Sequence, residues 1–257
     1  ARGMRVRMQV RNAMMRKRAL WSGEKMRIKS VCVFGSINMD LRAETPGTLP
    51  LAGRGVATTD VGRFTAAPGG KGANEAVSLA RLGVLTHLMG RVGRDDMGRS
   101  LLRHLQTVGA GRLNLQGVRY QEGVATGVAV QVVSNADKQK LALFCAGANG
   151  CVSERDVEEA SFLLSESTVN LLLLQLEVPM SSIMAIATEA RERGCIVALK
   201  AAPLTADVLL HVHDLLNFPS LDLLFLNEWD APMLIGSSEK PLVTVKQAER
   251  AAETILS

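Results

Sequence analysis

The sequence predicts an α/β protein in which a mostly parallel sheet is flanked by helices in three layers, with a small β lid. The chain has 257 residues, of which 47% are hydrophobic, and this is enough to bury a large core. Short apolar runs alternate with segments of helical periodicity along most of the chain. Parallel strands and their crossover helices follow one another in this order.

The elements follow from these patterns in chain order. The first strand is the apolar run 31–34, and further strands are expected at 86–91, 114–120, 126–133, 140–145, 170–176, 195–199 and 222–226. Helices are expected at 74–83, 97–108, 154–163, 180–193 and 245–256. We assign the lid to about residues 41–67 and 113–121, and the whole of 26–257 to one α/β domain.

A basic leader occupies residues 1–25. Residues 1–30 carry ten Lys and Arg side chains and one acidic residue, Glu24, so the rest of the chain is net acidic although the whole carries +5. The leader is interpreted as an organellar transit peptide, as translation upstream of Met26, or as a nucleic-acid-binding arm. The acidic remainder and the aromatic content of 4% argue against the last, so no nucleic-acid partner is expected.

The remaining composition indicates where the protein works. No apolar run is long enough to span a membrane. The four cysteines form no C-x-x-C pair and are interpreted as reduced thiols. We therefore expect a cytoplasmic location, or an organellar one if residues 1–25 are a transit peptide.

A glycine-rich turn, Pro-Gly-Gly-Lys-Gly-Ala-Asn at residues 68–74, opens directly onto a predicted helix with Asn74 near its cap. The unpaired N–H groups of a helix N-terminus bind small anionic or polar ligands. The spacing does not fit a phosphate loop, because Thr65 stands where that motif has glycine and Gly72 follows Lys71. It does not fit a dinucleotide fingerprint either, because Glu75 takes the place of the third glycine. A ligand site and a plain tight turn both remain open.

Polar residues follow the predicted strands where each strand ends. They are Asn38 and Asp40, Gln175 and Glu177, Lys200, and Asn227 and Glu228. Ligands of open parallel sheets bind outside the carboxyl ends of the strands. Carboxylates such as Asp40 and Glu177 can each accept two hydroxyl hydrogen bonds, which suits the vicinal diol of a sugar.

Seven motifs occur in one order along residues 29–257, and together they resemble the ribokinase, or PfkB, family of carbohydrate kinases. They lie at residues 35–40 (Gly-Ser-Ile-Asn-Met-Asp), 69–74 (Gly-Gly-Lys-Gly-Ala-Asn), 93–98 (Gly-Arg-Asp-Asp-Met-Gly), 125–129 (Ala-Thr-Gly-Val-Ala), 146–149 (Ala-Gly-Ala-Asn), 175–177 (Gln-Leu-Glu) and 226–228 (Leu-Asn-Glu).

The resemblance implies a fold, an activity and a set of site residues. The activity is transfer of the γ-phosphoryl group of ATP to the 5-hydroxyl of D-ribose, with Mg²⁺ and a monovalent cation such as K⁺. Family members pair their lids into homodimers. Asn227 would lie beside the nucleotide and Asp230, which stands where the family has Glu, beside the metal. The residues implied to hold the pentose are Asn38, Asp40, Gly70, Lys71, Gly72, Asn74 and Glu177.

Two departures from the family pattern carry expectations of their own. The family's general base is an aspartate in a Gly-Ala-Gly-Asp motif, whereas the one Gly-Ala-Gly here, at 109–111, precedes Arg112. No catalytic base is therefore expected within the chain, since the aspartate would lie beyond Ser257, and we expect these 257 residues alone not to phosphorylate ribose. The alternative is a non-catalytic ribokinase-like protein that binds a sugar or a partner. Lys200 stands where the family has Asn. Either its side chain contacts phosphate, or the constraint on the residue at this position is relaxed.

Overall fold

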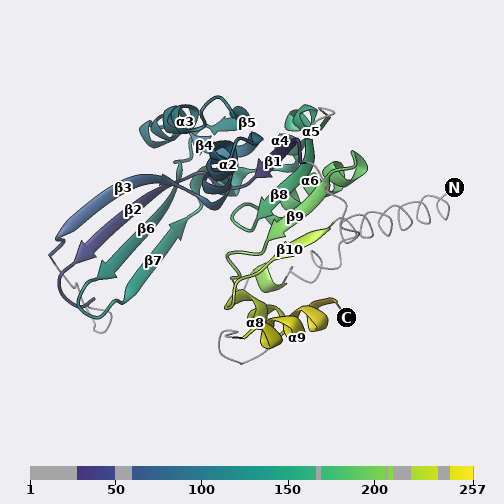
Figure 1. Cartoon of the computed structure of the whole chain (residues 1–257). Coiled ribbons are helices and arrows are strands. Elements are labelled where there is room, and N and C mark those ends of the chain that lie inside the picture. The colour runs from purple at the N-terminus through teal and green to yellow at the C-terminus, as the bar shows by residue number, and fades with distance from the viewer. Residues whose placement is uncertain are drawn as a thin grey trace.

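The computed structural model describes residues 28–49, 60–165, 169–205, 208–210, 221–236 and 244–256. The predicted leader, residues 1–25, and part of the predicted lid, residues 50–59, lie outside the described residues. The described residues form a six-stranded sheet with helices on both faces and a separate four-stranded sheet that extends away from it (Figure 1).

The larger sheet is parallel throughout, in the strand order β10-β9-β8-β1-β4-β5. Its strands are β1 (Ser30–Phe34), β4 (Leu85–Gly93), β5 (Leu113–Gln121), β8 (Val169–Gln175), β9 (Ile196–Lys200) and β10 (Leu223–Phe225). β1 lies in the middle, and all five of its residues are buried. A strand covered on both faces needs apolar residues at every position, and the unbroken run 31–34 provides them.

Two apolar cores cover the two faces of this sheet and confirm the three-layer prediction. Val31 and Val33 of β1 pack with α2 (Lys71–Arg81) and α3 (Asp96–Val108) on one face. Cys32 and Phe34 point to the other face, since side chains alternate along a strand. There they pack with α4 (Glu154–Ala160), α5 (Phe162–Ser165) and α6 (Met180–Glu192). The same core reaches α8 (Asp230–Leu234) and α9 (Val245–Leu256).

The smaller sheet is the lid. It consists of β2 (Asn38–Thr45), β3 (Arg63–Gly69), β6 (Gly127–Ser134) and β7 (Lys140–Cys145), in the order β3-β2-β6-β7. The central pair, β2 and β6, is parallel, and the outer pairs are antiparallel. All six residues of β7 are exposed, including Leu143 and Phe144.

The assignment of residues 113–121 to the lid was wrong. These residues form β5, which pairs in parallel with β4 at the edge of the larger sheet. Leu113, Leu115 and Val118 pack against the core beneath α2 and α3. A half-buried edge strand and a lid strand share the same alternating pattern, so the pattern alone does not assign a strand to its sheet. The second half of the lid comes instead from β6 and β7.

Three local boundaries differ from the expected ones or add to them. The helix expected from Asn74 begins at Lys71, directly after the turn at Gly70. The helix expected at 154–163 divides at Ser161 into α4 and α5. A short 3₁₀ helix, η1 (Gly147–Cys151), connects β7 to α4. Among the described helices, none has the length and apolar character needed to cross a bilayer.

Candidate functional site

The candidate site lies at the carboxyl ends of β1 and β8, where the strand order reverses direction. From β1 the chain continues through the lid to β4 and β5 on one side, and later returns to β8, β9 and β10 on the other. Such a reversal leaves a crevice between the two neighbouring strands. The segment after β1 carries Ser36 and Asn38, and the segment after β8 carries Glu177.

The glycine-rich turn fits closely beneath the chain that leaves β1. Gly70 has a φ of 91°, and a Cβ atom there would lie 2.7 Å from the carbonyl oxygen of Ser36. At Gly72 a Cβ would lie 2.7 Å from the carbonyl carbon of Gly35. The backbone N–H of Ala73 donates to the carbonyl oxygen of Ser36 at 3.0 Å. Glycine at 70 and 72 thus allows the N-terminus of α2 to approach the end of β1.

Glu177 joins three segments at this point. Its Oε2 atom accepts hydrogen bonds from the Ser36 hydroxyl and from the backbone N–H of Lys71, the latter at 3.0 Å. Its Oε1 atom accepts from Lys71 Nζ at 2.9 Å. Burial would raise the pKa of Glu177, but the hydrogen bonds from Ser36 and Lys71 outweigh it and hold this pKa below its ordinary value. Glu177 is therefore an ionised acceptor that fixes both the turn and the lysine.

Asp40 lies across the crevice on the lid strand β2. Its carboxylate packs against Gly69, where a Cβ would lie only 2.2 Å from the carboxylate carbon. Burial and then the negative charge of Glu177 raise the pKa of Asp40, while Lys71 and Lys140 oppose this rise. The two carboxylates predicted from the sequence thus interact electrostatically.

Asn38 and Asn74 occupy different environments. Asn38 is buried at the start of β2, and its Oδ1 accepts a hydrogen bond from Asn149 Nδ2 at 2.7 Å. Asn74 lies in the first turn of α2, and its side chain is exposed. The structure therefore brings Asn38, Asp40, Gly70, Lys71, Gly72 and Glu177 together, with Asn74 exposed in the first turn of the same helix.

Asn227 and Asp230 lie after β10, at the same edge of the sheet. Asn227 Oδ1 accepts from the backbone N–H groups of Trp229 and Asp230, at 2.8 and 2.7 Å, and so fixes the turn that leads into α8. Burial raises the pKa of Asp230, and Lys71 and Lys200 act against this rise. Asp230 is therefore within electrostatic reach of Lys71. In the described part of the chain, no group of three or more His, Cys, Asp or Glu side chains is arranged to hold a metal ion.

Lys200 at the end of β9 has a partner that the sequence did not indicate. Its Nζ lies 3.4 Å from Oε1 of Glu75, a residue in α2. The other oxygen of Glu75 accepts from the amide of Gln175, which is fully buried at the end of β8. Burial is the largest influence on the pKa of Glu75 and raises it, while Lys200 lowers it. The positive charge of Lys200 thus offsets the negative charge of the half-buried Glu75 carboxylate beside the crevice.

A second set of contacts holds the lid connections in place. Asp95 accepts from the N–H of Gly98 and from both the N–H and the hydroxyl of Thr126, each at 2.7 Å. Gly93 donates to the same hydroxyl at 3.0 Å. These contacts explain why the motifs at 93–98 and 125–129 occur together. They fix the link between β5 and β6 to the start of α3.

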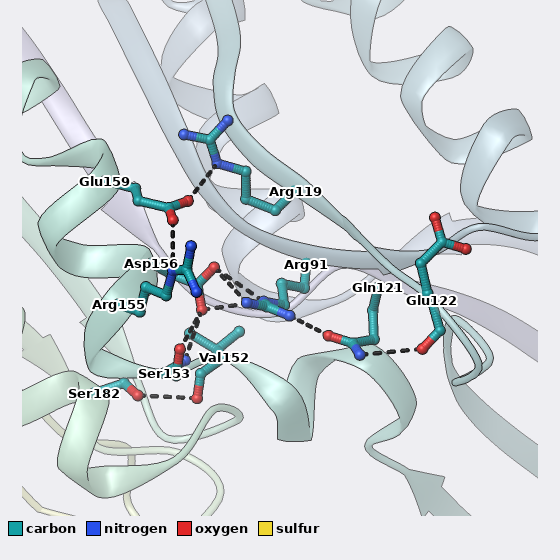
Figure 2. A network of polar contacts seen from close by, with 10 residues as sticks. All are labelled: Arg91, Arg119, Gln121, Glu122, Val152, Ser153, Arg155, Asp156, Glu159 and Ser182. Atoms are coloured by element: carbon teal, nitrogen blue, oxygen red, sulfur yellow. Dashed lines mark hydrogen bonds and ion pairs between the residues drawn. The ribbon is translucent and has the colours of Figure 1, made fainter.

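Figure 2 shows the contacts that anchor α4, the helix after η1. The guanidinium of Arg91 on β4 reaches both carboxylate oxygens of Asp156, from Nε at 3.0 Å and from Nη2 at 2.8 Å, and also contacts Gln121. Asp156 also closes a capping box with Ser153 at the start of α4. Ser182 of α6 donates to the carbonyl oxygen of Val152 at 3.0 Å. The segment that follows η1 is therefore attached to β4, β5 and α6.

The Gly-Ala-Gly sequence at 109–111 lies far from the candidate site along the strand direction. It forms the turn between the end of α3 and the start of β5. This turn is at the amino end of a parallel strand, whereas the crevice is at the carboxyl ends. Its position agrees with the sequence-based conclusion that this Gly-Ala-Gly does not supply the base.

Sequence reasoning named no role for Ser36, Glu75 or Asn149, which lie in the site. Ser36 and Asn149 are within motifs that were recognised, so the signal was present without a role attached to it. Glu75 gave a weaker signal, because a glutamate in the first turns of a helix is common on exposed surfaces. Its contacts with Gln175 and Lys200 connect residues 100 and 125 positions away.

An open parallel sheet flanked by helices, with a separate small lid sheet beside its switch point, defines the ribokinase-like class of α/β proteins. The family described as pfkB family carbohydrate kinase matches residues 28–257, and the chain belongs to this family.

Relatives in several organisms support this assignment. Ribokinase of Schizosaccharomyces pombe is 31% identical over 232 residues, which cover 89% of this chain and 68% of the relative. Deoxyribokinase of Salmonella typhi is 27% identical over 226 residues, 88% of this chain and 68% of the relative. The chain spans 63% of the Haemophilus influenzae ribokinase, to which it is 30% identical over 81% of its own length.

A solved structure has the same fold. Arabidopsis thaliana ribokinase complexed with ribose and ATP matches with a TM-score of 0.69 and 26% identity, over 90% of this chain and 69% of that chain.

Proposed function

We propose that the whole protein containing these 257 residues is an ATP-dependent carbohydrate kinase that converts D-ribose to ribose 5-phosphate. The observation that carries the proposal is the Lys71–Glu177 pair at the N-terminus of α2, facing the Asp40 carboxylate across the switch point. Membership of the pfkB family, relatives named ribokinase, and a structural neighbour complexed with ribose and ATP support it.

The sugar would bind between the two carboxylates. Asp40 is the stronger candidate for accepting a pair of vicinal hydroxyls, because Glu177 already accepts three hydrogen bonds. Lys71 Nζ, held by Glu177, would donate to a sugar oxygen. Gly70 and Gly72 would bring the turn close to the end of β1 and so to the ligand. Asn74 would contribute from the exposed side of the first turn.

The phosphates of ATP would lie on the side of Asn227 and Asp230. A single carboxylate suits Mg²⁺, which is bound mainly by phosphate oxygens and water with one or two protein carboxylates. Mg²⁺ held there would neutralise charge on the phosphates. A monovalent cation such as K⁺ remains a prediction from the resemblance.

Isothermal titration calorimetry with D-ribose tests the sugar site directly on the 257-residue chain. We expect measurable binding by the wild type and a loss of about tenfold or more in Glu177→Ala, since a charge-assisted hydrogen bond contributes about 1.5–3 kcal/mol. The control variant is Glu158→Gln, on an exposed position of α4. Failure of the wild-type chain to bind D-ribose would contradict the proposal.

Ribose-dependent ADP release, measured with a coupled assay, tests the reaction. We expect turnover by protein that carries the Gly-Ala-Gly-Asp segment and none by residues 1–257 alone. Turnover by the 257-residue chain would show that the base was assigned wrongly. Ribose binding without turnover by the whole protein would instead favour the non-catalytic sugar-binding alternative. Parallel assays with 2-deoxy-D-ribose and D-fructose define the preferred sugar.

A further inference from the structure

The buried side-chain amide of Asn149, which follows the lid, contacts the segment that carries the proposed sugar ligand Asn38. Asn149, in η1, is 1% exposed. Its Oδ1 accepts from the backbone N–H of Ile37 at 2.9 Å, and its Nδ2 donates to Asn38 Oδ1 at 2.7 Å. The same Nδ2 lies 3.1 Å from the carbonyl oxygen of Ala146 and 3.3 Å from that of Ile37. Asn149 thus bonds to Ile37, the last residue before β2, and to Asn38, the first residue of β2.

These contacts determine which way both amides face. The backbone N–H of Ile37 can only donate, so the group facing it must be the Oδ1 of Asn149. The Nδ2 of Asn149 then faces Asn38, which must present an acceptor, because two NH₂ groups cannot hydrogen-bond to each other. Asn38 therefore turns its Oδ1 inward, and its Nδ2 is left for another acceptor.

The pair has no room to rearrange. A Cβ atom at Gly127 on β6 would lie 2.2 Å from Asn149 Nδ2 and 2.4 Å from Asn38 Oδ1. The N–H of Ala148 donates to the carbonyl oxygen of Ala125 at 2.8 Å, which ties η1 to the link before β6. The contacts of Arg91, Asp156 and Ser182 hold the segment that follows (Figure 2). Asn149 is therefore held in place and orients the side-chain amide of Asn38.

We propose that Asn149 is a positioning residue for sugar binding: through the chain from Ile37 N–H to Asn149 to Asn38, it keeps the donor end of the Asn38 amide toward the sugar. The inference rests on the proposed function, because it assumes that Asn38 contacts the pentose. It assigns a purpose to the Ala-Gly-Ala-Asn motif, to which the proposed function gave none.

A double-mutant cycle in D-ribose affinity, measured by calorimetry on the 257-residue chain, tests this role. We expect Asn149→Ala and Asn38→Ala each to weaken binding about tenfold, the value of roughly one hydrogen bond. The double variant should bind no more weakly than Asn38→Ala alone, because Asn149 acts through Asn38. Additive losses would overturn the inference, as would unchanged affinity in Asn149→Ala.

Two controls separate positioning from folding. Ser182→Ala removes a buried hydrogen bond to the same segment without touching Asn38, so it should lower the thermal midpoint and leave ribose affinity unchanged. Equal loss of affinity in Ser182→Ala would show a purely structural effect and overturn the inference. If Asn149→Ala does not fold, Asn149→Asp replaces it in the cycle, since its carboxylate still accepts from Ile37.

An NMR measurement tests the inference on the wild-type chain. The side-chain NH₂ signals of Asn38, assigned by their loss in Asn38→Ala, should shift when D-ribose is added. Binding of D-ribose without any shift of these signals would overturn the inference and leave the proposed function standing. Absence of D-ribose binding by the wild type would overturn both.

Discussion

At the scale of single residues, the pKa values of the two crevice carboxylates are shifted in opposite directions. The pKa of Asp40 is raised, first by burial and then by the charge of Glu177, whereas hydrogen bonds hold the pKa of Glu177 low. A group with a raised pKa in the folded state stabilises the fold below its unfolded pKa, about 3.9 for Asp, and loses that contribution as the pH rises through the folded value. Ionised Asp40 therefore costs stability at pH 7.

Asp40→Asn should consequently raise the thermal midpoint at pH 7 while weakening D-ribose binding about tenfold or more. The gain in stability should shrink as the pH falls through the raised pKa of Asp40, because the wild-type carboxyl then takes up a proton. Wild-type ribose affinity should fall over the same acidic range, and the variant should lack this dependence. Thermal melts and calorimetry between pH 4 and 8 measure both effects. A lower midpoint of Asp40→Asn at pH 7 would contradict the assignment.

Lys200 permits a second prediction at this scale. Its side chain is half exposed, and such ion pairs contribute at most about 1 kcal/mol, so Lys200→Asn should lower the free energy of unfolding only slightly. Lys200→Asn in a Glu75→Gln background should not change the free energy of unfolding, because the carboxylate whose charge Lys200 offsets is then absent. Urea unfolding of the four proteins measures this. A raised KM for ATP in both backgrounds of the whole protein would instead favour a direct phosphate contact.

At the scale of elements, the contact of Arg91 with Asp156 joins α4 to the larger sheet (Figure 2). Both side chains are largely buried, and removal of one partner leaves an unpaired charge. Arg91→Met should therefore lower the free energy of unfolding by about 3 kcal/mol.

The matched control for this prediction is Arg155→Met. Arg155 lies on the exposed side of α4 and pairs with Glu159, as Figure 2 also shows. Its loss should change the free energy of unfolding by less than about 0.5 kcal/mol. Urea titrations compare the two variants. Equal effects would mean that the buried contact stabilises no more than an exposed one.

The elements also show what the sequence could predict. Alternating apolar runs located the strands, and with them the polar residues that follow the carboxyl ends of β1, β8 and β10, because both patterns follow from local burial. Local burial does not determine which sheet a strand joins. Residues 113–121 were therefore placed in the lid, although β5 pairs with β4 at the edge of the larger sheet. The partners of Asn38 and Lys200 were missed for the same reason. Asn149 and Glu75 reach them only through tertiary packing.

At the scale of the whole molecule, the lid presents apolar side chains to solvent. Leu143 and Phe144 of the edge strand β7 are 56% and 66% exposed, and Phe64 of β3 is 62% exposed. Unpaired edges with exposed apolar groups favour pairing with another chain. We therefore propose that two copies associate through their lids.

Analytical ultracentrifugation tests this association. The wild type should sediment as a dimer, and Phe144→Ser should weaken the dimer by about tenfold or more, since large aromatic side chains dominate interfaces. Leu82→Ser is the control, because Leu82 is 80% exposed at the end of α2, away from the lid. A monomeric wild type would contradict the proposal, and so would equal weakening in both variants.

The parallel pairing at the centre of the lid has a consequence for the order in which the molecule folds. Each outer pair is a local hairpin, whereas Asn38 pairs with Gly127 and the register continues at the same separation to Thr45 and Ser134. Contacts between distant parts of a chain form late, because a long loop must first close. During synthesis the hairpin of β2 and β3 would therefore wait for that of β6 and β7. Asn38 would meet Gly127 and Asn149 only when the two hairpins dock, so the proposed sugar site would be among the last parts to mature.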